Sequence, residues 1–328
     1  METRRIGNSE LVCSVLGFGS WEMGNAYGPI DPQEANRTVG VAIDSGITLF
    51  DTAEIYGLFR SEDLLGLALE GRRKDVIIVT KVGFGFNKDG KCTGHDCSRQ
   101  NLLNRVEGCL KRLRTDWIDL LLIHWPDHQT PHGETIGALE ELRKAGKIRY
   151  YGVSNYNVPM MEACMRHGEI VASQVGYNLF DRRMETQVLP FCAAHNIGFI
   201  AYGSLGFGLL TGALQPTTMP PKWSSGGVAF GLPLFQRDYF VKELKVVERL
   251  KAMAARYDRT VAQLAIAWVL GGQAVSVALV GVKNRSELTE NIQAVDWKLT
   301  AEDKAEIARI FTEEEVQTSK SFPQVLEC

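Results

Sequence analysis

The sequence predicts a (β/α)8 barrel that occupies residues 1–328 as a single domain. Eight short apolar runs recur along the chain, and each is followed by a segment with helix-start and helix-stop signals. These runs are apolar on successive residues, which is typical of parallel strands covered on both faces. Because no interdomain linker interrupts the eight units, a closed barrel is favoured over an open doubly wound sheet.

The expected strands are placed by their composition and by the glycines and polar residues that end them. Residues 3–13 precede them and predict a small hairpin, since a Gly-Asn-Ser turn lies between short apolar pieces. The eight strands are then expected at 14–21, 47–50, 75–80, 116–123, 148–153, 170–173, 197–202 and 274–280.

Helix signals fill the intervals between the strands. Asp31 can cap a helix whose first position is Pro32, with Glu34 completing a capping box. Ser61 and Ser98 are expected to cap the next two helices in the same way. The helices are predicted at 31–45, 61–71, 98–113, 134–145, 158–167, 184–195, 238–257, 260–271 and 286–294, with extra helical residues from 300 onward.

Polar and aromatic residues gather at the ends of the predicted strands. In a (β/α)8 barrel the carboxyl ends of all strands meet at one face, where the chemistry takes place. The residues at this edge are Trp21, Asp51, Tyr56, Lys81, His124, Trp125, Ser154, Asn155, Gln174, Tyr202 and Gly281.

Four of these residues suit proton transfer to a carbonyl oxygen. The pKa of a free tyrosine is about 10, and a nearby ammonium group such as Lys81 should lower the pKa of Tyr56. Asp51 would hold the ammonium charged, and His124 would supply a second hydrogen-bond donor. Such a set can protonate the oxygen but supplies no electrons, so a redox cofactor is implied.

Several motifs resemble those of the aldo-keto reductases, in the order and at the spacing of that family: DTAEIYG (51–57), SEDLLG (61–66), TK (80–81), LLIHWPD (121–127), GVSNY (152–156) and GVKNRSELTEN (281–291). The resemblance covers almost the whole chain. It implies an NADPH-dependent reduction of an aldehyde or ketone to the alcohol, with NADH as a possible second cofactor. The implied partner is therefore a small-molecule carbonyl substrate.

The resemblance also implies a role for individual residues. Tyr56 is the general acid, Lys81 and Asp51 tune it, and His124 positions the carbonyl group. Trp21 and Trp125 would wall the substrate pocket. The implied cofactor-binding residues are Ser154, Asn155 and Gln174 at the nicotinamide carboxamide, Tyr202 against the ring, Gly203, Ser204 and Leu205 at the pyrophosphate, Lys283, Glu287 and Asn291 around the adenosine, and also Gly281 at the end of the last strand.

The loop at 281–291 bears on the choice between NADPH and NADH. Lys283 and Arg285 precede a helix whose N-terminus favours an anion. Glu287 adds a negative charge nearby. The two cations and the helix end would attract the ribose phosphate of NADPH, and the one carboxylate would repel it. This balance predicts a preference for NADPH with measurable use of NADH.

Two other functions are alternatives to carbonyl reduction. Cys92, His95 and Cys97 lie within six residues and offer three soft ligands for zinc, which would suit a hydrolase on the same barrel. No metal site is expected, because the fourth ligand of a closed site is lacking. Alternatively the chain holds a cofactor without turnover and acts as a partner of other proteins, as the potassium-channel beta subunits do.

Composition excludes several partners. The net charge of -3 gives no reason to expect nucleic acid, and no apolar run reaches the ~20 residues of a membrane helix. A start without an apolar signal region and seven scattered cysteines favour free thiols and a cytoplasmic location. The sequence does not indicate the oligomeric state. The aromatic loop at 206–235, with Phe207, Trp223, Phe230 and Phe235, is expected to lie over the cofactor or substrate, or to pack as an ordinary loop.

Overall fold

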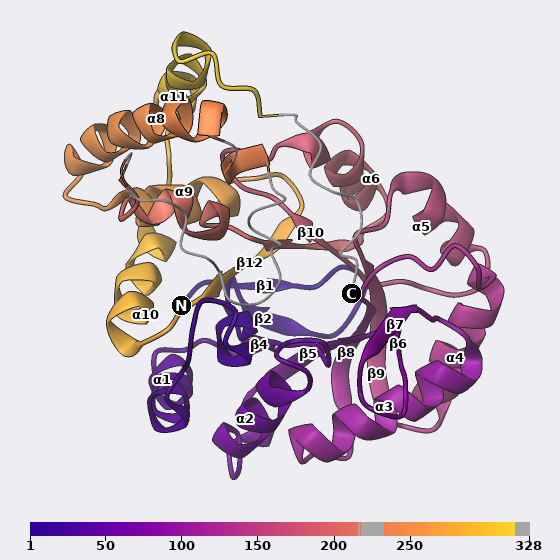
Figure 1. Cartoon of the computed structure of the whole chain (residues 1–328). Coiled ribbons are helices and arrows are strands. Elements are labelled where there is room, and N and C mark those ends of the chain that lie inside the picture. Colours follow the sequence, from indigo (N-terminus) through magenta and orange to yellow (C-terminus); the bar gives the residue numbers. More distant parts are fainter. Residues whose placement is uncertain (216, 218–232, 236, 319–328) are drawn as a thin grey trace.

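The computed structural model describes residues 1–215, 217, 233–235 and 237–318. Eight parallel strands close into a barrel, and helices surround it (Figure 1). The (β/α)8 prediction is therefore confirmed. Around the barrel the strands are β3 (Leu16–Gly19), β4 (Leu49–Asp51), β5 (Ile77–Val82), β8 (Ile118–Ile123), β9 (Ile148–Ser154), β10 (Ala172–Gly176), β11 (Gly198–Tyr202) and β12 (Val275–Gly281).

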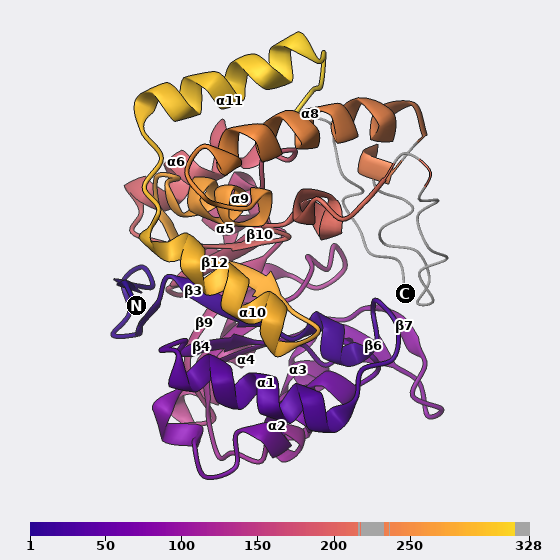
Figure 2. The same ribbon diagram turned by 90° about the vertical axis from the view of Figure 1, so that its left-hand side faces the viewer.

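The helices lie in the predicted intervals, with the additional α8 and α11 packed against each other on one side of the molecule (Figure 2). No helix in the described part of the chain combines the length and apolar character needed to cross a lipid bilayer. Their bounds are α1 (Pro32–Asp44), α2 (Arg60–Ala68), α3 (Arg99–Leu113), α4 (His132–Lys144), α5 (Val158–Met165), α6 (Val188–Ala194), α8 (Arg237–Ala255), α9 (Val261–Leu270), α10 (Arg285–Ile292) and α11 (Ala301–Glu313).

Two apolar clusters explain why the strands are hydrophobic on successive residues. In β8, Leu120 and Leu122 belong to the cluster inside the barrel, whereas Leu121 and Ile123 belong to the cluster between the barrel and its helices. All four side chains are fully buried. Since burying one such side chain stabilises the fold by about 1.5–3 kcal/mol, both faces of the strand contribute.

The predicted N-terminal hairpin is present. Strands β1 (Thr3–Arg5) and β2 (Val12–Ser14) pair in antiparallel fashion. Ile6 and Leu11, in the connection between them, are buried in the cluster inside the barrel. Figure 2 shows this hairpin at one end of the molecule, opposite the end from which β6 (Phe84–Phe86) and β7 (Cys92–His95) project.

The predicted helix caps are confirmed in part. Asp31 caps α1, because its carboxylate accepts hydrogen bonds from the backbone N–H groups of Gln33 and Glu34. Glu34 does not complete the capping box. Its side chain pairs instead with Arg37 and Arg285. Hydrogen bonds from these charged donors are stronger than a bond from the neutral backbone N–H of Asp31.

Ser61 is not a helix cap, and that prediction was wrong. The N-cap of α2 is Phe59, in a left-handed conformation at φ 77°. The hydroxyl of Ser61 is buried and lies 2.7 Å from Ser20 Oγ and 3.0 Å from Thr52 Oγ1. Ser61 therefore joins the loops after β3 and β4, which carry Trp21 and the Asp51–Tyr56 segment.

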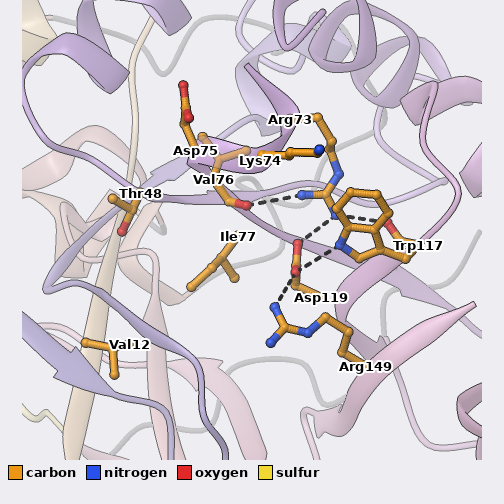
Figure 3. A pocket seen from close by; sticks show the side chains of 10 residues that line it. All are labelled: Val12, Thr48, Arg73, Lys74, Asp75, Val76, Ile77, Trp117, Asp119 and Arg149. Atoms are coloured by element: carbon orange, nitrogen blue, oxygen red, sulfur yellow. Dashed lines mark hydrogen bonds and ion pairs between the residues drawn. The ribbon is translucent and has the colours of Figure 1, made fainter. Parts of the chain in front are cut away.

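A pocket of about 310 Å³ lies at the amino ends of the strands, away from the polar edge predicted from the sequence (Figure 3). Three of its charged side chains form one network. The buried carboxylate of Asp119 accepts hydrogen bonds from Arg73 at 2.7 Å, from Arg149 at 3.0 Å and from the backbone N–H of Ile78 at 3.0 Å. The network thus ties β5, β8 and β9 together.

We expect Asp119→Ala to lower the free energy of unfolding by about 3 kcal/mol, because two guanidinium groups lose a shared buried partner. The ratio kcat/KM should not change, because the residue is remote from the carboxyl ends of the strands. Urea unfolding and steady-state kinetics measure the two effects. Asp75→Ala, which removes an exposed ion pair with Arg72, is the matched control and should cost about 1 kcal/mol or less. Equal losses in the two variants would contradict the structural role of the network.

Candidate active site

The structure brings Asp51, Tyr56 and Lys81 into one hydrogen-bonded chain. Asp51 ends β4, Lys81 lies near the end of β5, and Tyr56 lies in the loop after β4. The Lys81 Nζ atom is 2.6 Å from Asp51 Oδ1 and 3.0 Å from the Tyr56 hydroxyl oxygen. It also donates to the carbonyl oxygen of Thr52 at 2.9 Å. Asp51 and Lys81 are 3% and 0% exposed, so they form an ion pair without water between them.

Burial is the largest influence on the pKa values of Asp51, Lys81 and Tyr56. It raises the pKa of Tyr56 well above its ordinary value, and the charges of Asp51 and Glu22 act in the same direction. Burial also raises the pKa of Asp51 and lowers that of Lys81, while each charge opposes the shift of the other. On balance the pKa of Tyr56 is therefore raised, not lowered as its neighbour Lys81 alone predicts, because burial dominates in the protein without ligand. Tyr56 keeps its proton, which is the state that a proton donor needs.

His124 follows β8 and faces Tyr56. The ring centroids are 5.7 Å apart, in an edge-to-face arrangement. Burial lowers the pKa of His124 well below its ordinary value, and the charges of Lys81 and His95 lower it further. The imidazole is therefore neutral near pH 7. It can donate one hydrogen bond, but it is not a charged acid that would compete with Tyr56 for that role.

The residues predicted at the nicotinamide join the same network. The Gln174 Nε2 atom donates to Asp51 Oδ2 at 2.7 Å, and the Ser154 hydroxyl donates to the Gln174 carbonyl oxygen at 2.8 Å. The Tyr202 hydroxyl donates to Asn155 Oδ1 at 2.9 Å. Asn155 has a left-handed backbone at φ 63°, which turns the chain sharply after β9. One set of bonds thus connects the ends of β4, β9, β10 and β11.

The residues predicted at the pyrophosphate lie directly after β11. Gly203 has φ +65°, a conformation that favours glycine. The hydroxyl of Ser204 is buried and donates to the carbonyl oxygen of Leu279 in β12 at 2.8 Å. Leu205 packs against the outer core cluster. Since the Ser204 side chain is engaged, this segment offers its backbone to a ligand more readily than its hydroxyl.

Of the predicted adenosine residues, Lys283 and Glu287 lie at the N-terminal end of α10, whereas Asn291 lies near its C-terminal end. Asn284 is the N-cap and accepts from the backbone N–H of Glu287 at 3.0 Å. The Glu287 carboxylate accepts from the backbone N–H of Lys283 at 2.8 Å. Arg285 pairs with Glu34 at 3.0 Å, and Asn291 is buried within the helix. Lys283 is exposed, whereas the guanidinium of Arg285 is already bound, so the two predicted cations are not equivalent.

The two tryptophans that were predicted to wall a pocket lie in the segments after β3 and β8, which are separated by β4 and β5 in the barrel. Trp21 begins η1 (Trp21–Gly24), and its ring centroid is 6.3 Å from that of Phe207. Trp125 is 7% exposed, and its Nε1 atom is buried without a hydrogen-bond partner among the described residues. Of the aromatic residues predicted at 206–235, Phe207 thus reaches Trp21, whereas Phe235 packs against Phe240 in the core. Trp223 and Phe230 lie outside the described residues.

Sequence reasoning missed two residues near the site. The first is Glu22, which follows Trp21 directly at a strand end, so its position was a usable signal. The second is His95, which the β6–β7 hairpin places near the site. The rings of His95 and Phe84 are 5.1 Å apart, those of Phe84 and His124 are 5.5 Å apart, and the His95 Nε2 atom is buried without a partner in the described part of the chain.

The residues described by the structure contain no group of three histidine, cysteine or acidic side chains that could hold a metal ion. Cys97, one of the three candidate zinc ligands, is a buried thiol whose pKa is raised by burial. Cys92, a second candidate ligand, begins β7 and is half-buried. Like Cys97, the cysteines at 13, 109, 164 and 192 are free and buried.

Comparison with known proteins agrees with this arrangement. The model of the Aldo/keto reductase family matches residues 15–311. The chain is 36% identical over 314 residues to Aldo-keto reductase YhdN of Bacillus subtilis, covering 94% of this chain and 93% of that one. It is 31% identical over 313 residues to the NADH-specific methylglyoxal reductase of Escherichia coli, covering 91% and 94%.

Solved structures show the same similarity. The glycerol dehydrogenase AKR11B4 from Gluconobacter oxydans matches with a TM-score of 0.87 and 31% identity, over 99% of both chains. An aldo/keto reductase from Klebsiella pneumoniae, solved in complex with NADP and acetate, matches with a TM-score of 0.72 and 28% identity over 94% of this chain and 95% of that one. The chain therefore belongs to the aldo/keto reductase family and is an NAD(P)H-dependent oxidoreductase.

Proposed function

We propose that the protein reduces a small aldehyde or ketone to the corresponding alcohol, with NADPH preferred over NADH and with Tyr56 as the proton donor. The observation that carries the proposal is the buried chain Asp51–Lys81–Tyr56, in which Lys81 bonds both neighbours at 2.6 and 3.0 Å. The positive charge of Lys81 beside the tyrosine oxygen would favour the phenolate that remains after proton transfer. Asp51 keeps this charge in place.

The side chains of the site would have separate roles in the reaction. His124, as a neutral imidazole, holds the carbonyl oxygen by a hydrogen bond near the Tyr56 hydroxyl. Tyr56 then passes its proton to that oxygen as negative charge develops on it. Trp21 and Trp125 exclude water from the reacting carbonyl. When bound, the nicotinamide cofactor supplies the hydride that reduces the carbonyl carbon.

The residues present fit a nicotinamide dinucleotide. Among the buried polar atoms that lack a partner in the described residues, His124 Nδ1, Trp125 Nε1 and Glu22 Oε2 belong to residues of the proposed site, and a bound ligand could supply their missing partners. Lys283 stands exposed near the N-terminus of α10 and suits a phosphate. The residues that would hold the cofactor are Ser154, Asn155, Gln174, Tyr202, Gly203, Ser204, Leu205, Gly281, Lys283, Glu287 and Asn291.

The function is tested by following NADPH and NADH oxidation at 340 nm with a panel of aldehydes, ketones and keto-sugars. Methylglyoxal and glyceraldehyde belong in the panel because relatives are named for methylglyoxal and glycerol. We expect carbonyl-dependent oxidation with at least one class, and formation of the alcohol in equal amount. Tight cofactor binding without turnover of any member would contradict the proposal and indicate a cofactor-holding protein.

Lys283→Ala should weaken binding of NADPH by roughly ten- to a hundredfold, because one charge-assisted hydrogen bond is worth about 1.5–3 kcal/mol. Affinity for NADH should change little, since it lacks the phosphate on the adenosine ribose. Fluorescence titration of both cofactors measures the difference. Arg285→Ala is the matched control. It should have a smaller effect, because Glu34 already binds that guanidinium. Equal binding of the two cofactors by the unmodified protein would rule out the role of Lys283.

A further inference from the structure

Glu22 presents a carboxyl group to the region assigned to the cofactor. It lies in η1, and its carboxyl group covers the end of β12 so closely that a Cβ atom on Gly281 would overlap both carboxylate oxygens. The Oε2 atom is shielded from water and has no hydrogen-bond partner among the described residues. The family resemblance assigns no role to this residue.

The backbone N–H of Glu22 itself favours the charged carboxylate through a hydrogen bond and is the second largest influence on its pKa, after burial. From the loop after β12, Glu287 repels the charge and Lys283 attracts it, neither through a hydrogen bond to the carboxyl group. Burial is the largest effect and raises the pKa of Glu22 to about 7. Burial raises the pKa of Tyr27 and of Tyr56 well above the ordinary value, and the charge of Glu22 raises both further. Both tyrosines therefore stay neutral.

The pyrophosphate of a bound dinucleotide would add two negative charges near Glu22. The residues proposed for the pyrophosphate, Gly203–Leu205, directly follow β11, and the neighbouring strand β12 ends at Gly281, a further proposed cofactor residue, which Glu22 covers. An ionised carboxylate would repel the phosphates there. A protonated carboxyl group carries no charge and offers an O–H donor to an anionic oxygen.

We propose that Glu22 is a cofactor-binding residue that acts as a neutral carboxylic acid, so that the dinucleotide binds together with one proton. This inference rests on the proposed function, because it requires the cofactor at the assigned place. It makes Glu22 a determinant of cofactor affinity and gives that affinity a pH dependence.

The sign of the pH dependence follows from linkage. Bound phosphate raises the pKa of Glu22 above its value in the free protein, so the complex holds more protons than the free protein does in that interval. Affinity is therefore independent of pH below about pH 7 and falls as the pH rises above it, by up to about tenfold per pH unit. Glutamine resembles the protonated acid in shape and charge and should remove this dependence.

The experiment measures the dissociation constant of NADH by quenching of protein fluorescence between about pH 6 and pH 9. NADH is the probe because the ribose phosphate of NADPH itself titrates near pH 6. The unmodified protein should lose affinity above about pH 7, whereas Glu22→Gln should bind equally well throughout. Glu10→Gln, at an exposed acid in the N-terminal hairpin region, is the matched control and should keep the pH dependence.

Calorimetry of the unmodified protein gives a second readout that needs no variant. Titrations with NADH at about pH 8, in two buffers of different ionisation enthalpy, should reveal uptake of close to one proton. No proton uptake, or an unchanged pH dependence in Glu22→Gln, would overturn the inference while leaving the proposed function intact. Weaker binding by Glu22→Gln at pH 6 would overturn it too, since it would show that the carboxylate charge is needed. Failure to bind either dinucleotide would overturn both proposals.

Discussion

Replacing Tyr56 by phenylalanine should lower kcat for carbonyl reduction by about 10²- to 10⁴-fold, the usual contribution of general acid catalysis. The ring would keep its packing against His124, and only the hydroxyl that bonds Lys81 would be lost. The dissociation constant for NADPH should stay within about twofold, because Tyr56 is not assigned a contact with the cofactor. Steady-state kinetics and cofactor titration separate the two quantities.

The matched control is Tyr257→Phe, which removes another tyrosine hydroxyl that donates a hydrogen bond, here to Asp303 at 2.6 Å. Tyr257 lies just beyond α8, remote from the strand ends that carry the site, so kcat should not change. If Tyr56→Phe turns over at a normal rate, another group supplies the proton and the role of Tyr56 is refuted.

Lys81→Met should impair both activity and stability. Methionine keeps much of the apolar stem but removes the ammonium group, so Asp51 remains in the interior without its ion-pair partner and with only its bond from Gln174. Removing one member of a buried ion pair costs about 3–5 kcal/mol, and urea unfolding near pH 7 should reveal a loss of that size. Without the adjacent charge the Tyr56 phenolate is disfavoured further, so kcat should fall and its pH dependence should move upwards.

The double variant Asp51→Asn/Lys81→Met distinguishes the two effects. It no longer buries an unpaired carboxylate, so part of the lost stability should return, while activity should remain low because Tyr56 still lacks its charged partner. Recovery of activity together with stability would mean that Lys81 acts only through folding. A pH–rate profile that is the same in the unmodified protein and in a residually active Lys81→Met variant would also refute the tuning role.

Much of the fold and of the site could be predicted from the sequence, because both depend on local sequence patterns. The apolar runs that become β5 and β8 are long, and the first polar residues after or near their ends, Lys81 and His124, are the ones that reach the site. Parallel closure then places these ends at one face, so the spacing of the residues along the chain does not matter.

The errors arose where contacts distant in sequence decide the outcome. Ser61 has the sequence context of a cap, but its hydroxyl is taken by Ser20, far away in the chain. The segment of the β6–β7 hairpin is rich in glycine and no strand is predicted there, yet it forms a hairpin through antiparallel pairing of Phe84 with His95. The pKa of Tyr56 was predicted from its charged neighbour alone, whereas burial, which the sequence does not quantify, dominates.

The same limit explains why Glu22 was overlooked. A glutamate after a tryptophan reads as an ordinary exposed residue, because acidic side chains are mostly exposed. Only the approach of η1 to Gly281 at the end of β12 places its carboxyl group in the interior of the site. A side chain at 281 would force the Glu22 carboxyl group to move from its present position.

The most direct test follows a label from the cofactor to the product. The protein is loaded with NADPH that carries deuterium at both positions of nicotinamide C4, mixed with the best carbonyl of the panel, and the alcohol is analysed by mass spectrometry. One deuterium per molecule of alcohol is expected for the unmodified protein, with a rate about 10²-fold or more lower for Tyr56→Phe at equal cofactor occupancy. Alcohol without deuterium, or equal rates in the two proteins, would contradict carbonyl reduction with Tyr56 as the proton donor.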